Sequence, residues 1–309
     1  MFDFADAKEV EKYLEELRTS VIQRLKKGKT VCVPDIPIYN IPNDSTIFID
    51  STDVAYSSHG IHEFPAKFIP QIPRWAILKF CKTKDGEERD KWVLDPFCGS
   101  GTTLVEAKLS GVNACGIDID PMARLLTKVK TTYYEKSELE SARSKILSTL
   151  YSSDIDHKEV PDFPNRDHWF DIQVSKSIAI VKKSIEKTTT DKDVREFFYV
   201  CLSAIIRTVS LADPDQIFPE KTEWGLKKKS KMNKTLVFNK FEQSVNKFMP
   251  RILDFSNNCY KDVKVKLIKE DARKLELDSN SIDVSITSPP YINAMDYPRV
   301  NQLEMYWLG

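Results

Sequence analysis

The groups that most directly suggest chemistry are the side chains of Ser288 and Tyr291, which flank two consecutive prolines in the sequence TSPPY. An alternating apolar run at residues 282–286 precedes them and predicts a strand. Because proline has no amide hydrogen, Pro289 and Pro290 must end this strand, and they stiffen the turn that follows. A rigid turn at the carboxyl end of a strand lies where open α/β sheets bind ligands.

A second candidate site is the glycine turn in the sequence VLDPFCGSGTTLVEA. We expect a strand to end at Asp95 and a helix to begin at Thr102, with Gly99 and Gly101 in the turn between them. Glycines allow a backbone to approach a ligand closely, and the first N–H groups of a helix can bind an anion. Pro96 and the missing third glycine distinguish this turn from the usual NAD loop. A purely structural strand-to-helix turn is the alternative.

Acidic residues follow two further predicted strands. Asp118 in GIDID could accept hydrogen bonds from both hydroxyls of a ribose. Asp120 is the alternative for that role, although it is better placed to cap the helix that starts at Pro121. Asp271 in KEDARKL could accept from an adenine amino group, and a plain turn aspartate is equally compatible with the sequence.

Composition indicates a globular protein. The chain has 309 residues, with 46 basic and 46 acidic side chains and therefore a formal net charge of zero. Neutrality argues against non-specific coating of nucleic acid but leaves room for a local basic cleft. No signal peptide or bilayer-length apolar run is present, so we expect a cytoplasmic location and no membrane contact. The cysteines are far apart and fit reduced thiols rather than disulfides or a zinc site: Cys32, Cys81, Cys98, Cys115, Cys201 and Cys259.

The order of elements predicts an α/β fold with a doubly wound parallel sheet. Helices are expected at 5–27 and 68–81, and strands near 93–95, 113–118, 263–268 and 282–287. Between them, residues 133–257 read as a mainly helical insertion, with apolar helical spacing in 166–187, 195–212 and 236–254. The predicted division is 1–58 for an N-terminal helix and connector, 59–132 with 258–309 for the α/β domain, and 133–257 for the insertion.

Two features of the insertion have open alternatives. The segment KTEWGLKKKSKMNK is either a solvated loop or an arm that contacts phosphates, through Lys227, Lys228, Lys229, Lys231 and Lys234. Trp169 and Phe170 fit a core position better than a base-stacking role.

Taken together, DPFCGSGTT, GIDID and TSPPY resemble the amino-methylating DNA methyltransferases that use S-adenosylmethionine, and SPPY resembles their cytosine-N4 branch. HGIHEFPAKFIPQIPRWAI, residues 59–77, resembles the family's first motif, which lies against the methionine end of the cofactor. The resemblance implies a Rossmann-like methyltransferase sheet and methylation of DNA, as in a restriction–modification system. It covers 59–133 and 262–309 well, and the insertion only loosely.

The resemblance also implies roles for individual residues. Ser288 Oγ and the Pro289 carbonyl would accept from the target amine, Pro290 would hold the turn, and Tyr291 would stack on an extruded base. Lys67 could instead be an ordinary surface lysine, and Cys98 is more readily a buried filler than a nucleophile. No metal is implied. The implied cofactor-binding residues are Phe64, Lys67, Asp95, Pro96, Phe97, Gly99, Gly101, Thr102, Thr103, Asp118, Ile119 and Asp271.

The resemblance leaves several alternatives open. The amine could be adenine N6 in DNA or guanine N2 in RNA, and the chain could be a non-catalytic subunit. A complete sheet of this kind has more strands after the catalytic turn, whereas 18 residues follow Tyr291. We therefore expect a sheet that is incomplete at its C-terminal side, either in a fragment or in a chain that a second polypeptide completes, and we expect the chain alone to be inactive or poorly soluble.

Overall fold

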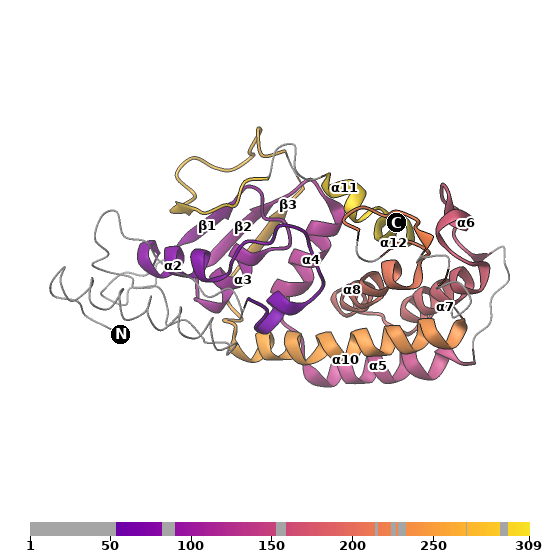
Figure 1. Cartoon of the computed structure of the whole chain (residues 1–309). Coiled ribbons are helices and arrows are strands. Elements are labelled where there is room, and N and C mark those ends of the chain that lie inside the picture. The colour runs from indigo at the N-terminus through magenta and orange to yellow at the C-terminus, as the bar shows by residue number, and fades with distance from the viewer. Residues whose placement is uncertain are drawn as a thin grey trace, which may run out of the picture.

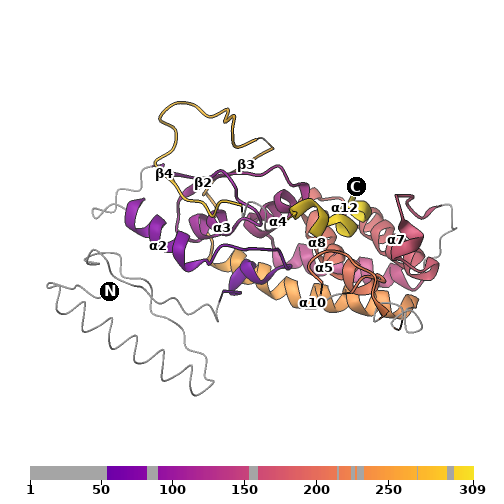
Figure 2. The same cartoon turned by 45° about the horizontal axis from the view of Figure 1, so that its top comes forward.

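The structure is a computed structural model of the whole chain. It describes residues 54–81, 90–152, 159–213, 216–223, 227, 233–269, 271–290 and 296–309. The predicted helix at 5–27 and most of the lysine-rich segment lie outside these residues. A parallel sheet and a helical bundle lie side by side, and the long helix α10 (Lys234–Asn258) runs along both (Figures 1 and 2).

Four parallel strands form the sheet, in the order β3-β2-β1-β4. They are β1 (Trp92–Asp95), β2 (Asn113–Ile117), β3 (Val265–Ile268) and β4 (Val284–Ser285). All four therefore end at the same edge, and that edge carries the loops that begin after Asp95, Ile117, Ile268 and Ser285. This is the α/β fold with a parallel sheet that the sequence predicts, and it is consistent with a Rossmann-like methyltransferase.

Alternation along the strands explains why the sheet forms. Val93 and Ala114 belong to one buried cluster, whereas their neighbours Leu94 and Cys115 belong to another. Successive side chains of a strand point to opposite faces, so both faces of the sheet are apolar, as in parallel sheets. Helices α2 (Gln71–Phe80) and α3 (Thr102–Leu109) supply Ile77 and other apolar residues to the first cluster.

Helix α4 (Pro121–Thr131) links the sheet to the bundle. Asp120 caps it by accepting from the Met122 amide at 2.8 Å, and Pro121 occupies the first turn, as predicted. Its residues Leu126 and Val129 join one large buried cluster that also includes Ile61. The bundle therefore shares a continuous hydrophobic core with the α/β part.

The bundle contains α5 (Lys136–Leu150), α6 (Arg166–Trp169), α7 (Ile172–Thr188), α8 (Lys192–Val209) and α10. Asp171 caps α7 and Asp191 caps α8, which fixes where these helices begin. After β4 the chain returns to the bundle as α11 (Tyr297–Val300) and α12 (Gln302–Leu308), and α12 packs on α8. Within the described part of the chain, no helix combines the length and apolarity needed to cross a membrane.

Three elements differ in extent from the sequence prediction. The predicted helix at 166–187 is broken between α6 and α7, because Asp171 is extended and caps the second piece. The predicted strand at 282–287 has only two residues in the ladder, although the amides on either side of them, of Asp283 and Ile286, also donate to carbonyls of β1. Helix α10 is longer than the predicted 236–254 and contains Pro250.

Candidate functional site

The glycine turn joins β1 to α3 and adopts a backbone that glycine favours. Gly99 and Gly101 have φ of +50° and +85°, in the left-handed region. A Cβ on Gly101 would lie 2.7 Å from Thr127 Cγ2 of α4, so the position also requires the absence of a side chain. The Thr127 hydroxyl donates to the Gly99 carbonyl at 2.8 Å, which anchors the turn on α4. No side chain caps the start of α3, so its first N–H groups remain suited to an anion.

Asp95 organises this turn from within. It is 3% exposed, its Oδ2 accepts from the Thr103 hydroxyl at 2.6 Å, and its Oδ1 accepts from the Phe97 amide at 3.2 Å. Burial raises the pKa of Asp95 to about 6, although these hydrogen bonds partly oppose the shift. Thr103 is thus engaged by Asp95, whereas Thr102 faces the open side of the turn.

Asp118 follows β2 and lies beside the turn. Its Oδ2 accepts from the Gly99 amide at 2.9 Å and its Oδ1 from the Asp120 amide at 2.8 Å. Burial raises the pKa of Asp118, but each oxygen retains a lone pair for another donor. Two large apolar side chains are exposed nearby in sequence: Ile119 by 73% and Phe97 by 42%. Exposed apolar groups beside a carboxylate suit a ligand that has both a flat ring and hydroxyls.

The turn that contains Ser288 and the glycine turn meet in one hollow at the carboxyl edge of the sheet. We call it the edge hollow. Its wall combines three segments far apart in sequence: residues 64–68, the glycine turn at 95–102 and Ser288. Phe64 lies against Gly99, with 3.4 Å between the ring and a Cβ built on that glycine. Ser288 reaches this edge because β4 pairs in parallel with β1, and the chain after β4 therefore leaves the sheet beside the glycine turn. In this pairing the Ile286 amide donates to the Leu94 carbonyl at 2.9 Å.

A buried carboxylate holds the segment before Phe64 against α3. Glu106 is fully buried; its Oε1 accepts from the Tyr56 hydroxyl and lies 2.6 Å from His59 Nε2, and its Oε2 accepts from Arg74 Nε at 2.8 Å. Burial opposes ionisation of Glu106, but the partners His59 and Arg74 outweigh it and lower its pKa. Burial lowers the pKa of His59, so its neutral ring donates from Nε2.

Other predicted residues lie in different surroundings. Lys67 lines the edge hollow and donates to the carbonyls of His59 at 3.3 Å and His62 at 3.5 Å. Asp271 does not line the hollow; its carboxylate pairs with Arg273, which lowers its pKa to about 2. Pro289 and Pro290 are exposed, and Pro96 lies in the turn. Tyr291 lies outside the described residues.

Cys98, Trp169 and Phe170 take the core positions that the sequence favoured. Cys98 is 5% exposed and packs in the sheet cluster, where burial raises the pKa of its thiol well above its usual range. A thiol held in its neutral form is a poor nucleophile. Phe170 is 1% exposed in the bundle core, and Trp169 packs against the same cluster. The described residues contain no group of acids, histidines and cysteines that could hold a metal ion.

Sequence reasoning missed two features. The four partners at Tyr56, His59, Arg74 and Glu106 are scattered along the chain, and the one signal was an acid within the otherwise apolar run LVEA. It also missed a cavity between the bundle and residues 60–65, which is described below.

The chain is similar in sequence to known DNA methylases and methyltransferases. A family model described as DNA methylase matches residues 43–128, which include the first motif, the glycine turn and Asp118. The type II methyltransferase M.MvaI of Kocuria varians is 29% identical over 286 residues, covering 86% of this chain and 61% of the relative. The type II methyltransferase M.BsoBI of Geobacillus stearothermophilus is 28% identical, covering 72% of this chain and 48% of the relative.

A shorter similarity extends to an RNA enzyme. The tRNA (guanine(10)-N2)-dimethyltransferase of Methanothermobacter thermautotrophicus is 33% identical over 81 residues, or 26% of this chain and 23% of the relative. The chain thus spans about half to three fifths of the type II relatives above and a smaller part of this one. Over these parts the chain is similar to DNA methylases and to type II methyltransferases.

Proposed function

We propose that this chain transfers a methyl group from S-adenosylmethionine to the N4 amine of cytosine in DNA. The observation that carries the proposal is the shared wall of the edge hollow, where Ser288 lies with the glycine turn. A methyl donor bound at the glycine turn and a target amine bound at Ser288 would meet in this hollow. Ser rather than Asp or Asn before the two prolines favours cytosine.

The residues around the hollow fit S-adenosylmethionine by chemical type. The amides at the start of α3 and the Thr102 hydroxyl suit its carboxylate, and Asp118 suits its ribose. The exposed side chains of Phe97 and Ile119 offer apolar surface for adenine. When bound, the cofactor supplies a methyl carbon attached to a positively charged sulfur. Asp271 would bind the cofactor's adenine only if its carboxylate gave up the hydrogen bonds from Arg273.

The chain's own groups would activate the amine. The lone pair of an exocyclic amine is delocalised into the base, so the nitrogen is a weak nucleophile until it becomes pyramidal. Ser288 Oγ and the Pro289 carbonyl accept from the amino hydrogens and favour that geometry, and the two prolines fix both acceptors before reaction. Tyr291 would stack on the extruded base.

Two alternative functions are methyl transfer to a different exocyclic amine. The similarity to type II methyltransferases is compatible with adenine N6 in DNA, and the similarity to a tRNA dimethyltransferase is compatible with guanine N2 in RNA. A second polypeptide that extends the sheet also remains part of the proposal. It is supported by β4, which pairs only with β1 among the described strands.

Mass analysis of nucleosides tests the proposal. The chain is incubated with unmethylated DNA and S-adenosylmethionine, and the DNA is digested and analysed. Because its sheet is expected to be incomplete, we expect N4-methylcytosine from the chain alone at no more than a low rate. We expect Ser288→Ala to lower that rate by about 10²-fold, as when one preorganised hydrogen-bonding group is removed. Ser285→Ala, at an exposed serine of β4, is the matched control. N6-methyladenine would show that adenine N6 is the target amine instead. No methylated base despite cofactor binding would favour a non-catalytic subunit, or a fragment or split chain that needs more polypeptide.

A further inference from the structure

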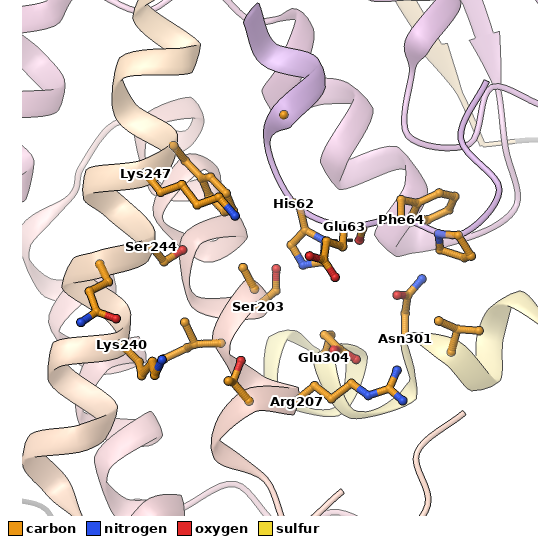
Figure 3. A pocket seen from close by; sticks show the side chains of 18 of the residues that line it. His62, Glu63, Phe64, Ser203, Arg207, Lys240, Ser244, Lys247, Asn301 and Glu304 are labelled. Carbon is orange, nitrogen blue, oxygen red and sulfur yellow. Dashed lines mark hydrogen bonds between the residues drawn. The ribbon is translucent and has the colours of Figure 1, made fainter. Parts of the chain in front are cut away.

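A second and larger cavity lies between the helical bundle and the segment that precedes the glycine turn (Figure 3). We call it the interhelix cavity. It has a volume of about 820 Å³, and its walls come from residues 60–65, α8, α10 and the α11–α12 region. Phe64 lines both this cavity and the edge hollow, so the two spaces adjoin at one aromatic side chain.

Three buried polar side chains line the interhelix cavity and have an atom without a hydrogen-bond partner among the described residues. They are His62, Asn301 and Glu304, which are 7%, 4% and 6% exposed. Figure 3 shows them around the same space, from two different segments. Leaving a buried polar atom unpaired costs about 1–3 kcal/mol, so several around one cavity indicate a polar ligand.

The charges on the walls are mixed. Lys240 and Lys247 are seven residues apart on α10, and with Ser244 they share one side of that helix. Arg207 on α8 is fixed by donation to the carbonyls of residues 213 and 216–218. Glu304 of α12 lies across from the lysines (Figure 3). A wall that carries a carboxyl as well as three cations does not suit a simple anion, and a wall with so many polar groups does not suit an apolar ligand.

The unpaired atoms present both donors and acceptors. His62 Nδ1 lies 2.5 Å from the Glu63 carbonyl, which can only accept, so Nδ1 carries the hydrogen and Nε2 is an acceptor. Burial lowers the pKa of His62 to about 4, which keeps the ring neutral near pH 7. Asn301 Nδ2 is a donor. Adjacent donors and acceptors match the edge of a nucleobase, and lysines match a phosphate.

We propose that the interhelix cavity binds one unstacked nucleotide of the substrate strand, with its base edge at Asn301 and Glu304 and its phosphate at Lys240 and Lys247. The cavity volume is within the range of small-molecule sites, about 300–1,000 Å³. The ring of Phe64 on the shared wall offers a stacking surface. This inference rests on the proposed function, and it gives the helical insertion a role in holding the strand next to the reacting base.

Salt-dependent binding tests the phosphate side. Anisotropy of a fluorescein-labelled 12-nucleotide deoxycytidine strand is measured with the full chain between 50 and 200 mM salt. Each phosphate contact to a single strand contributes about 0.7 to the slope of log K against log salt, and the proposal places one phosphate at both lysines. Lys240→Ala with Lys247→Ala should therefore lower the slope by about 0.7. Over this fourfold salt range, the affinity lost should become about 2.6-fold smaller. Lys145→Ala with Lys187→Ala, two exposed lysines on α5 and α7, is the matched control and should leave the slope unchanged.

Crosslinking tests the base side, first with the unmodified protein and then with one variant. A strand that contains 5-iododeoxycytidine is irradiated with the chain, and the attached peptides are identified by mass analysis. We expect attachment within residues 60–65 or 300–304, and we expect Asn301→Ala to reduce it. Attachment confined to other segments, or an unchanged salt slope in the double lysine variant, would overturn the inference.

The outcomes separate this inference from the proposed function. Strand binding that depends on the two lysines, without any methylated base, would leave the inference standing and remove the proposed activity. If the protein methylates DNA but the double lysine variant has the same salt slope as the unmodified protein, the inference falls and the proposed function stands. An RNA strand of the same sequence is the second arm, and tighter binding of DNA than of RNA is the result expected for a DNA substrate.

Discussion

The buried Glu106 cluster yields a sharp prediction about stability. Glu106→Gln leaves the side-chain volume nearly unchanged but removes a charge that Arg74, His59 and Tyr56 all face. A glutamine amide has one accepting oxygen, so either Arg74 or the other two donors would meet its NH₂ group. Unpaired buried donors cost about 1–3 kcal/mol each, and breaking a buried ion pair costs about 3–5 kcal/mol. We expect the free energy of unfolding to fall by about 3 kcal/mol.

The assay is urea unfolding followed by circular dichroism at several pH values. The lowered pKa of Glu106 means that its contribution is present above the unfolded pKa of 4.5 and is lost as the pH falls through the folded value. The difference between the two proteins should therefore be full at pH 7 and should disappear in acid. Glu138→Gln, at an exposed site on α5, should change stability by less than about 0.5 kcal/mol. Equal stability of Glu106→Gln and the unmodified protein at pH 7 would refute this reasoning.

Three further predictions concern the turn, its carboxylate and the interhelix cavity. Gly101→Ala should cost about 2–4 kcal/mol in urea unfolding, from left-handed strain and the close contact with Thr127. Gly111→Ala has a φ of +78° and would meet the Tyr260 ring only at an ordinary contact distance of 3.5 Å, so it should show the strain alone. Asp118→Asn should weaken binding of S-adenosylhomocysteine by about 10- to 100-fold in calorimetry, because an amide cannot accept at both positions; unchanged affinity would contradict the assigned role. Burial raises the pKa of Glu304 from 4.5 to about 7, so its ionisation should destabilise the fold by about 3 kcal/mol as the pH rises from 4.5 to 7. The same unfolding assay should find Glu304→Gln more stable than the unmodified protein above pH 7 but not below pH 4.5, and a gain of equal size at both pH values would contradict the buried carboxyl.

The parts of the fold that could be predicted from sequence rest on local chemistry. Alternating apolar residues set the strands, and glycines that need a positive φ mark the turn after Asp95. Asp120 followed by Pro121 marks the start of α4, because a side-chain acceptor and a fixed φ both act within one turn. Where a cap interrupts a periodic pattern, as Asp171 does before α7, apolar spacing alone gave one helix instead of two.

The features that sequence could not supply depend on tertiary contacts. The Glu106 cluster joins side chains up to 50 residues apart, and nothing in the spacing of Tyr56, His59 and Arg74 indicates that they meet. The interhelix cavity needs α8, α10 and α12 at once, and α12 reaches them only after the chain crosses from β4 to the bundle. Arg273 lies two residues after Asp271 in the sequence, but only the structure shows that it pairs with the Asp271 carboxylate and lowers its pKa.

Hydrogen exchange with and without S-adenosylhomocysteine most directly tests the central claim that the two turns form one site. The account predicts slower exchange of amides in three segments together: residues 64–68, the glycine turn at 97–104, and residues 286–288 beside the prolines. Protection of the glycine turn with no change at 286–288, or protection confined to the helical bundle, would contradict the account.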